Sequence, residues 1–415
     1  MKQRGEPLKQ AKSKTRTPVP RGLGRTGPVI LSYGFRPFFL AAGIWGTLAM
    51  ALWTAALGFD LEIGSTYGRA AWHAHEMLFG YSSAALAGFL LTAVPNWTGR
   101  LPVAGLPLAG LLALWVAGRL VLLCPDVLGL VPSTAIDAAF LPTLLAVCSR
   151  EIIAGKKWKD LKILAGIAVL ACANASFHLC NLAGWGTELS GRGAVAGYTV
   201  LIMIIGGRIL PSFTRNWLAK NGASRFPAPY GHFDTLAIAV GVVALASWVW
   251  SPETLATGTL GLAAGLLHLV RLYRWRGWEC GREPLVLVLH LAYGFIATGL
   301  IGIGAAALGY FQPIAALHIL TVGGIGTMTL AVMSRASRGH TGLTLRASLV
   351  TVCSYVAIAI ATLLRPIAWI LPDSEMMLLE AAGCAWVIAF ALFTFEYAPI
   401  LLFRRKELPI SRVTA

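Results

Sequence analysis

Apolar segments separated by short polar connections follow one another along nearly the whole chain. A membrane-spanning helix needs about 20 mainly apolar residues. Twelve segments meet this requirement, at about 36–58, 72–94, 102–124, 133–153, 161–183, 191–210, 233–250, 254–273, 284–308, 313–334, 345–369 and 376–402. Helices are expected because a backbone that faces lipid must satisfy its own hydrogen bonds, and the sequence lacks the alternating segments of a membrane β-barrel. The pattern predicts an all-α, polytopic membrane protein with about 12 transmembrane helices.

The composition supports this class and excludes several others. Hydrophobic residues make up 57% of the 415 residues and charged residues only 13%, whereas soluble domains carry about 25% charged residues. A soluble enzyme or a disordered chain is therefore excluded. The seven Cys residues include no CxxC motif and most lie in apolar segments, so neither a disulfide scaffold nor a covalent haem attachment is indicated.

Basic residues are distributed unequally, and the formal net charge is +16. With the N-terminus in the cytoplasm, 30 of the 34 Lys and Arg residues fall on the cytoplasmic side. Such an excess orients membrane proteins, so we expect both termini in the cytoplasm and no nucleic acid as a partner. We expect a disordered basic tail at 1–30, a twelve-helix membrane domain at 31–403 and a short cytoplasmic tail at 404–415.

Three of the predicted helices begin at similar intervals. The second, sixth and tenth start near residues 72, 191 and 313, about 120 residues apart, and each ends in a polar stretch that contains Arg. Three four-helix units would explain this spacing, although a shared topology alone could also produce it.

Six of the eight histidines fall inside predicted spans, and the topology gives their depths. An outer layer contains His73, His75, His178 and His318, and an inner layer contains His268 and His290. In a bilayer core about 30 Å thick, these two histidine layers lie about 12–15 Å apart along the membrane normal. His340 and His232 lie in cytoplasmic connections.

Histidines within membrane spans indicate function, because an ionisable side chain is costly there. Imidazole is a common ligand of copper, zinc and iron, including haem iron. We therefore predict a metal or haem at the outer layer, with His268, His290 and His340 as further candidate ligands. The alternative is that each histidine is a hydrogen-bonded core residue.

His73 and His75 are two positions apart, so on a regular helix they point to different sides. Either this first turn is not helical, or only one of the two binds a given metal. Glu76 follows directly and could orient a histidine ligand or transfer protons. The alternative for Glu76 is a solvated carboxylate at the membrane interface.

Arginines form the other group of candidates. Guanidinium groups bind carboxylates bidentately, so those at the inner ends of spans could hold haem propionates, namely Arg208, Arg215 and Arg335; positive-inside topology alone would also place them there. Arg36, in the segment SYGFRPFF, and Arg119, inside an apolar helix, are further candidate cofactor ligands. Arg119 needs a partner in the membrane, and the acidic residues available within spans are Asp137, Glu380 and Glu396.

Four segments together resemble the NnrS family of bacterial inner-membrane proteins. They are SYGFRPFFLAAGIWG (32–46), WHAHEMLFGYSSAALAGFLLTAVPNWTGR (72–100), GGRILPSFTRNWL (206–218) and HILTVGGIGTMTLAVMSRASRGHTG (318–342). The resemblance covers about 31–402 and implies a twelve-helix protein that contains haem and copper and relieves nitrosative stress during denitrification. The histidines in family-like segments are His73, His75, His178, His290, His318 and His340, whereas His268 lies in a less distinctive stretch.

The resemblance and the outer histidine layer suggest chemistry on nitric oxide. This molecule partitions into bilayers, and joining two molecules into nitrous oxide needs two electrons and two protons, which a quinol or a second haem could help to deliver. We therefore expect a protein that binds nitric oxide at a haem–copper centre and reduces or detoxifies it, as a nitric oxide reductase-type oxidoreductase would.

Three alternatives remain open. A proton-coupled or metal transporter would explain the glycine-rich segment TVGGIGTM and the repeats. A nitric oxide sensor would bind without turnover. A relation to haem–copper oxidase subunits would explain the helix number, but their His–His pair and His-x-x-x-Tyr motif are absent from the sequence.

Overall fold

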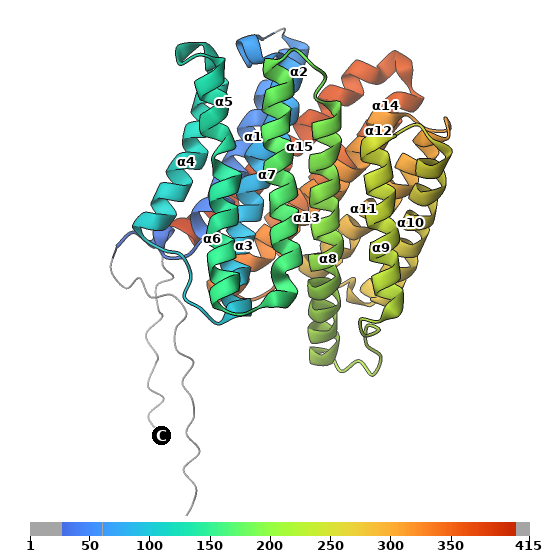
Figure 1. The fold of residues 1–415 in the computed structure, drawn as a ribbon. Helices are drawn as coiled ribbons and strands as arrows, with labels where there is room; N and C mark the ends of the chain where they lie inside the picture. Colours follow the sequence, from blue (N-terminus) through green and yellow to red (C-terminus); the bar gives the residue numbers. More distant parts are fainter. Residues whose placement is uncertain (1–26, 60, 404–415) are drawn as a thin grey trace, which may run out of the picture.

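Twelve helical spans that are long and apolar enough to cross a membrane make up most of the chain (Figure 1). The computed structural model describes residues 27–59 and 61–403, and this part of the chain contains no β-strand. The predicted all-α membrane fold is confirmed. Of the two predicted tails, 404–415 and nearly all of 1–30 lie outside the described residues.

Several of the spans are composed of more than one helical segment. In chain order the spans are α1 (Phe35–Gly58); α2 (Arg69–His75), η3 (Glu76–Tyr81) and α3 (Ser82–Thr98); α4 (Leu106–Leu123); α5 (Leu130–Ala138) and α6 (Phe140–Ala154); α7 (Leu161–Leu182); α8 (Glu188–Lys220); α9 (His232–Trp250); α10 (Leu255–Arg274); α11 (Pro284–Ala307); α12 (Pro313–His318), η7 (Ile319–Gly326) and α13 (Thr327–His340); α14 (Leu349–Ile370); and α15 (Glu375–Leu402). Short 3-10 turns precede or connect them: η1 (Val29–Leu31), η2 (Ser65–Tyr67), η4 (Pro125–Val127), η5 (Trp158–Asp160), η6 (Gly277–Cys280) and η8 (Pro372–Ser374).

The second and tenth spans each contain a π-helical segment. Segment η3 begins directly after His75, and η7 begins directly after His318. The fourth span is also interrupted, between α5 and α6, two residues after Asp137. π-helical turns inside α-helices occur frequently at functional sites, so these interruptions direct attention to the residues beside them.

The second, sixth and tenth spans lie at the centre of the bundle. The most apolar window of the second span is 83% buried and those of the sixth, ninth and tenth are each 67% buried, whereas the other spans reach at most 39%. Helix α3 contacts α13, and α8 contacts both η3 and η7. The three spans with similar spacing in the sequence therefore pack against one another, while the prediction of three repeated units stays a prediction.

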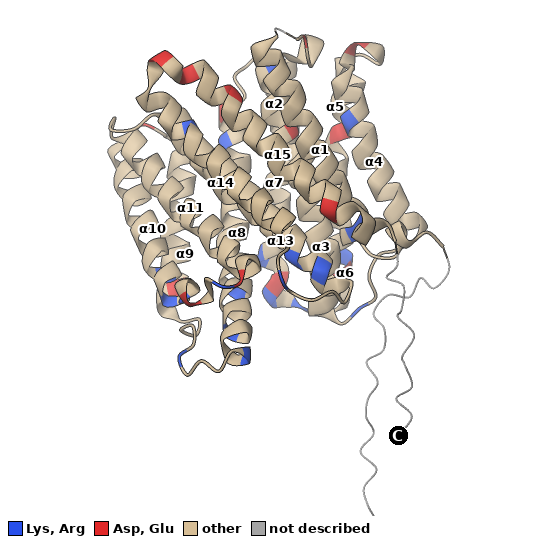
Figure 2. Ribbon diagram, turned by 180° about the vertical axis from the view of Figure 1, so that it is seen from behind, with Lys and Arg blue, Asp and Glu red and all other residues tan. Residues whose placement is uncertain are grey.

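The two ends of the described chain lie on the same side of the bundle, where η1 contacts α15. Most Lys and Arg residues gather at this end (Figure 2). Helix α8 also protrudes there, because it ends at Lys220 and not near residue 210 as the hydropathy pattern predicts (Figure 1). An even number of spans places both termini on one side of the membrane. The basic residues at that end agree with the predicted cytoplasmic side.

This orientation leads to a testable topology. Alkaline phosphatase fused after Gly186, in the connection between α7 and α8, should be active, because the enzyme folds only outside the cytoplasm. Fusion of the same enzyme after Tyr230, between α8 and α9, should be inactive, whereas green fluorescent protein fused there should fluoresce. The reverse activities would show that the basic end faces outward.

Candidate metal centre

Two histidines and an aspartate from three spans meet inside the first half of the bundle. The Nε2 atoms of His75 and His178 lie 3.1 Å and 2.9 Å from Oδ2 of Asp137. One donor atom from each residue lies within 4.8 Å of the other two, and all three residues are buried. Asn174 adds an oxygen, since its Oδ1 lies 3.0 Å from Nε2 of His75. We call these four residues the His–Asp cluster.

The helices that hold the His–Asp cluster place its members precisely enough to meet. His75 is the last residue of α2, and Asp137 is the next-to-last residue of α5, so both lie where a span is interrupted. Asn174 and His178 are four residues apart in α7, a spacing that puts both on one face of a helix. Three different spans therefore contribute polar groups to one buried point.

A further hydrogen bond orients each imidazole. Nδ1 of His75 lies 3.0 Å from Oε1 of Glu76, and Nδ1 of His178 lies 3.0 Å from the phenol oxygen of Tyr67. Burial raises the pKa of Tyr67, which lies in η2 outside the spans, so its phenol stays protonated. Metal-binding histidines commonly use their second nitrogen in this way, which directs the first nitrogen toward the metal.

Arg119 connects the two carboxylates beside the cluster. Its Nη1 donates to Oε2 of Glu76 at 2.5 Å, and its Nη2 donates to Oδ1 of Asp137. Trp45 also donates to Oε2 of Glu76, at 2.6 Å. A side chain at Gly80 would overlap Arg119 and Glu76, so the close approach of the guanidinium requires glycine at this position.

The charges of this buried group do not balance. Glu76 and Asp137 are carboxylates that accept hydrogen bonds from Arg119, and two negative charges with one positive charge leave a net charge of −1. Nδ1 of His75 faces a carboxylate and must therefore carry a proton, so Nε2 of a neutral His75 would point a lone pair at Asp137 and Asn174. A cation between these atoms, either a second proton on His75 or a metal ion, offsets the negative charge and removes the repulsion.

The donor atoms suit a first-row transition metal. Metal–ligand bonds of about 2.0–2.2 Å in a tetrahedral site put neighbouring donors about 3.3–3.6 Å apart. Nε2 of each histidine lies 2.9–3.1 Å from Oδ2 of Asp137, and the donor atoms of the three residues all lie within 4.8 Å of one another. Imidazole favours copper, iron, zinc and nickel, and two histidines with one carboxylate also occur in iron sites. The donor set is thus compatible with copper without selecting it over iron or zinc.

A comparison with known protein families identifies the family of this chain. The family described as NnrS protein matches residues 29–405. The chain belongs to the NnrS family. No curated protein sequence matches it. The match covers every span, so the His–Asp cluster lies within the part of this NnrS protein that is shared with its family.

The structure divides the predicted outer histidine layer of this NnrS protein into two groups. His75 and His178 belong to the His–Asp cluster, with ring centroids 4.7 Å apart. His73 points to the other side of α2, where it stacks on Trp53 with ring centroids 4.2 Å apart. Because α2 is helical here, the prediction that His73 and His75 do not share a face is confirmed.

His318 forms the second group together with His73. Nη2 of Arg365 lies 2.9 Å from Nε2 of His318, and Arg365 lies within electrostatic range of His73 as well. Nδ1 of His73 is buried without a hydrogen-bond partner in the described part of the chain. We call these residues, with Trp53, the His73–His318 group.

The remaining histidines lie apart from both groups. In the inner half, Nδ1 of His268 lies 2.6 Å from the phenol oxygen of Tyr293, and Nε2 of His290 lies 2.8 Å from Oγ1 of Thr214. His340 is exposed at the end of α13 and stacks on Tyr33. The second ring nitrogens of the two inner histidines, Nε2 of His268 and Nδ1 of His290, are buried without a hydrogen-bond partner in the described part of the chain, and the assignment of all three histidines as metal ligands stays a prediction.

The predicted cofactor-binding arginines, Arg119 excepted, lie near the basic end of the bundle. Arg36 donates to the carbonyl oxygens of Ile400 and Leu401 and so caps the end of α15. The other three contact side chains: Arg208 pairs with Asp160 at 2.9 Å, Arg215 lies over Phe226 and Arg335 lies over Phe213. Protein groups thus already surround these four arginines, and their binding to a cofactor stays a prediction.

The structure tests two expectations about acidic residues: the environment of Glu76 and the partners of Arg119. Glu76 is fully buried, so the alternative of a solvated interfacial carboxylate is wrong. Of the proposed partners of Arg119, Asp137 is correct, whereas Glu396 pairs with Arg338 at 3.3 Å. Glu76 was missed as a partner of Arg119, although its position within an apolar segment could have indicated this.

Removal of the Arg119 charge should destabilise the fold strongly. Arg119→Met leaves two buried carboxylates without their cation, a change that costs about 3–5 kcal/mol. We expect a correspondingly lower free energy of unfolding for the detergent-solubilised protein, measured by denaturant titration with tryptophan fluorescence. Arg150→Met is the matched control, because Arg150 is 67% exposed and its pair with Glu151 is at the surface, so its loss should cost at most about 1 kcal/mol. Equal stability of the two variants would contradict the role given to Arg119.

Proposed function

We propose that this NnrS protein is a metalloprotein of the bacterial inner membrane that binds nitric oxide and reduces or otherwise detoxifies it. The observation that supports this most is the buried His–Asp cluster, whose unbalanced charge favours a bound cation. Family membership supports the connection with nitric oxide. A site buried among membrane spans is directly accessible to a small molecule that dissolves in the bilayer.

The copper ion implied by the family fits the His–Asp cluster. His75 and His178 would bind it through Nε2, and Asp137 would contribute a carboxylate oxygen. A copper ion there would supply a binding position for nitric oxide and accept or donate one electron. Glu76 and Tyr67 hold the two imidazoles through Nδ1, and Arg119 restrains Asp137 through its other oxygen.

The haem implied by the family fits the His73–His318 group. Nδ1 of His73 lacks a hydrogen-bond partner within the described residues, so this imidazole is the one the group offers for iron. Arg365 donates to Nε2 of His318 and would have to turn from that imidazole to pair with a propionate. Haem iron would bind nitric oxide and carry one electron. Trp53, stacked at 16° to the His73 ring, restrains the orientation of this ligand.

The reduction of two nitric oxide molecules to nitrous oxide and water consumes two electrons and two protons. Glu76 accepts hydrogen bonds from Trp45 and Arg119 and contacts Nδ1 of His75, so as a carboxylate it orients this imidazole, and its part in proton transfer stays a prediction. We propose a quinol of the bilayer or another electron donor as the source of electrons.

The copper assignment predicts the metal content of specific variants. The purified protein should contain stoichiometric copper by mass spectrometry, and His75→Ala and His178→Ala should each lose most of it, because each removes one imidazole ligand. His232→Ala, at an exposed position at the start of α9, is the control and should keep its copper. Unchanged copper in both cluster variants would refute the assignment.

The haem assignment predicts an independent spectroscopic result. The protein should be coloured, with a Soret band that shifts when nitric oxide is added, and His73→Ala or His318→Ala should change or abolish that band while copper remains. A colourless wild-type protein would favour the transporter alternative. With an electron donor present, nitrous oxide should form, whereas a shifted band without nitrous oxide would identify a sensor.

A further inference from the structure

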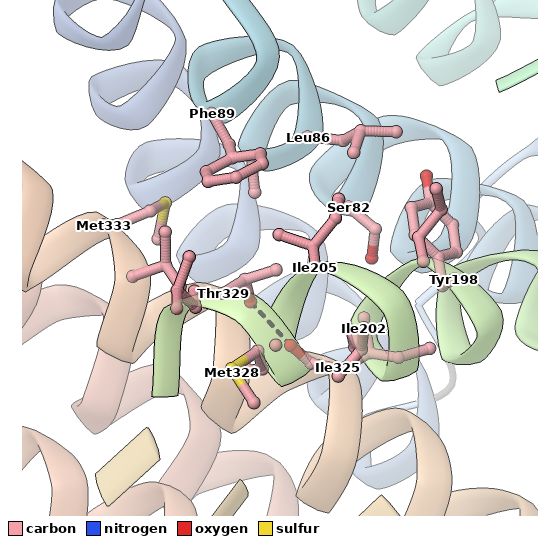
Figure 3. A pocket seen from close by; sticks show the side chains of 15 residues that line it. Ser82, Leu86, Phe89, Tyr198, Ile202, Ile205, Ile325, Met328, Thr329 and Met333 are labelled. Atoms are coloured by element: carbon pink, nitrogen blue, oxygen red, sulfur yellow. Dashed lines mark hydrogen bonds between the residues drawn. The ribbon is translucent and has the colours of Figure 1, made fainter. Parts of the chain in front are cut away.

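A cavity of about 70 Å³ lies between the three central spans (Figure 3). Its fifteen lining residues come from α3, α8, η7 and α13 alone. They lie in the middle of the second, sixth and tenth spans, and the surrounding side chains include Phe89, Ile205 and Met328. The cavity is therefore located at the centre of the bundle, at the depth of its apolar segments.

Three hydroxyl groups line the cavity, and each already donates a hydrogen bond to a backbone carbonyl. Ser82 donates to the oxygen of Met77 at 2.7 Å, Tyr198 to that of Leu78 at 2.9 Å, and Thr329 to that of Ile325 at 2.8 Å. A buried water needs about two to four polar partners, and no lining side chain has a donor to spare. The remaining lining is apolar, so the cavity offers water few partners and favours an apolar molecule.

The volume restricts what the cavity can hold. A cavity needs roughly 10–15 Å³ to admit one water-sized molecule, and benzene occupies an engineered cavity of about 150 Å³. At about 70 Å³, this cavity has room for a diatomic or monatomic gas. An apolar lining without free donors selects an uncharged, apolar gas.

One π-helical segment, η3, contacts both the lining of the cavity and the His–Asp cluster. Ser82 and Tyr198 line the cavity and donate to carbonyls of η3. The same segment begins directly after His75, and its Phe79 packs on the His75 ring with centroids 5.3 Å apart. Through these contacts, η3 connects the lining of the cavity with the His–Asp cluster.

We propose that the central cavity binds a small apolar gas and supplies it to the His–Asp cluster. The identity of this gas as nitric oxide rests on the function proposed above, whereas the binding of an apolar gas rests only on the cavity. In this arrangement the cavity concentrates gas from the bilayer next to the metal centre, and filling the cavity slows delivery without changing the centre.

Xenon tests the cavity without nitric oxide or turnover. Crystals of the wild-type protein under xenon pressure should show anomalous density between α3, α8 and α13. Ala85→Leu places a larger side chain at a lining position and should abolish this density, and Val332→Phe provides a second filled variant if the first does not fold. Ala165→Leu, the same change at an exposed position of α7, should leave it unchanged.

The supply role is tested by stopped-flow absorbance of the holo-protein mixed with nitric oxide. The filled variant should bind nitric oxide several-fold more slowly than wild type and Ala165→Leu, with the same copper content and the same spectrum at saturation. Absence of xenon from the wild-type cavity, xenon retained in the filled variants, or unchanged association rates would overturn the proposal. If the wild type binds xenon but no nitric oxide, the proposed function fails while the gas site stands.

Discussion

The pairing of Arg119 with Glu76 and Asp137 is the constraint on which this part of the structure depends. A guanidinium within apolar helices is costly unless carboxylates surround it, and these two carboxylates come from two different spans, the second and the fourth. Once they meet around Arg119, His75 lies between them and His178 completes the group. The ion pairs therefore connect the fold to the site, because the same oxygens that neutralise Arg119 also orient the imidazoles.

The sequence predicted the architecture well and the site only in part. Hydropathy located all twelve spans, since lipid imposes both their length and their helical conformation. Depth along the spans grouped His73, His75, His178 and His318, but depth contains no information about rotation or lateral position. Helix packing separated this layer into two groups, which a single sequence cannot show.

Other features had weaker or no sequence signals. Asn174 lies four residues before His178, a spacing that could have indicated a second polar group on the same face. Tyr67 lies in a short connection, where no periodicity exists to place it. The π-helical segments also escape prediction, because the hydrophobic pattern of a span is almost unchanged by one wider turn.

The histidine groups lie between the predicted four-helix units rather than within them. His75 and His178 bridge the first and second units, His73 and His318 the first and third, and His268 contacts Tyr293 between the second and third. This distribution has a consequence for biogenesis. The four residues of the His–Asp cluster all precede residue 179, so five inserted spans suffice to complete it. The His73–His318 group, which includes Arg365 of α14, must wait for the eleventh span, so synthesis on the ribosome imposes an order in which the two groups form.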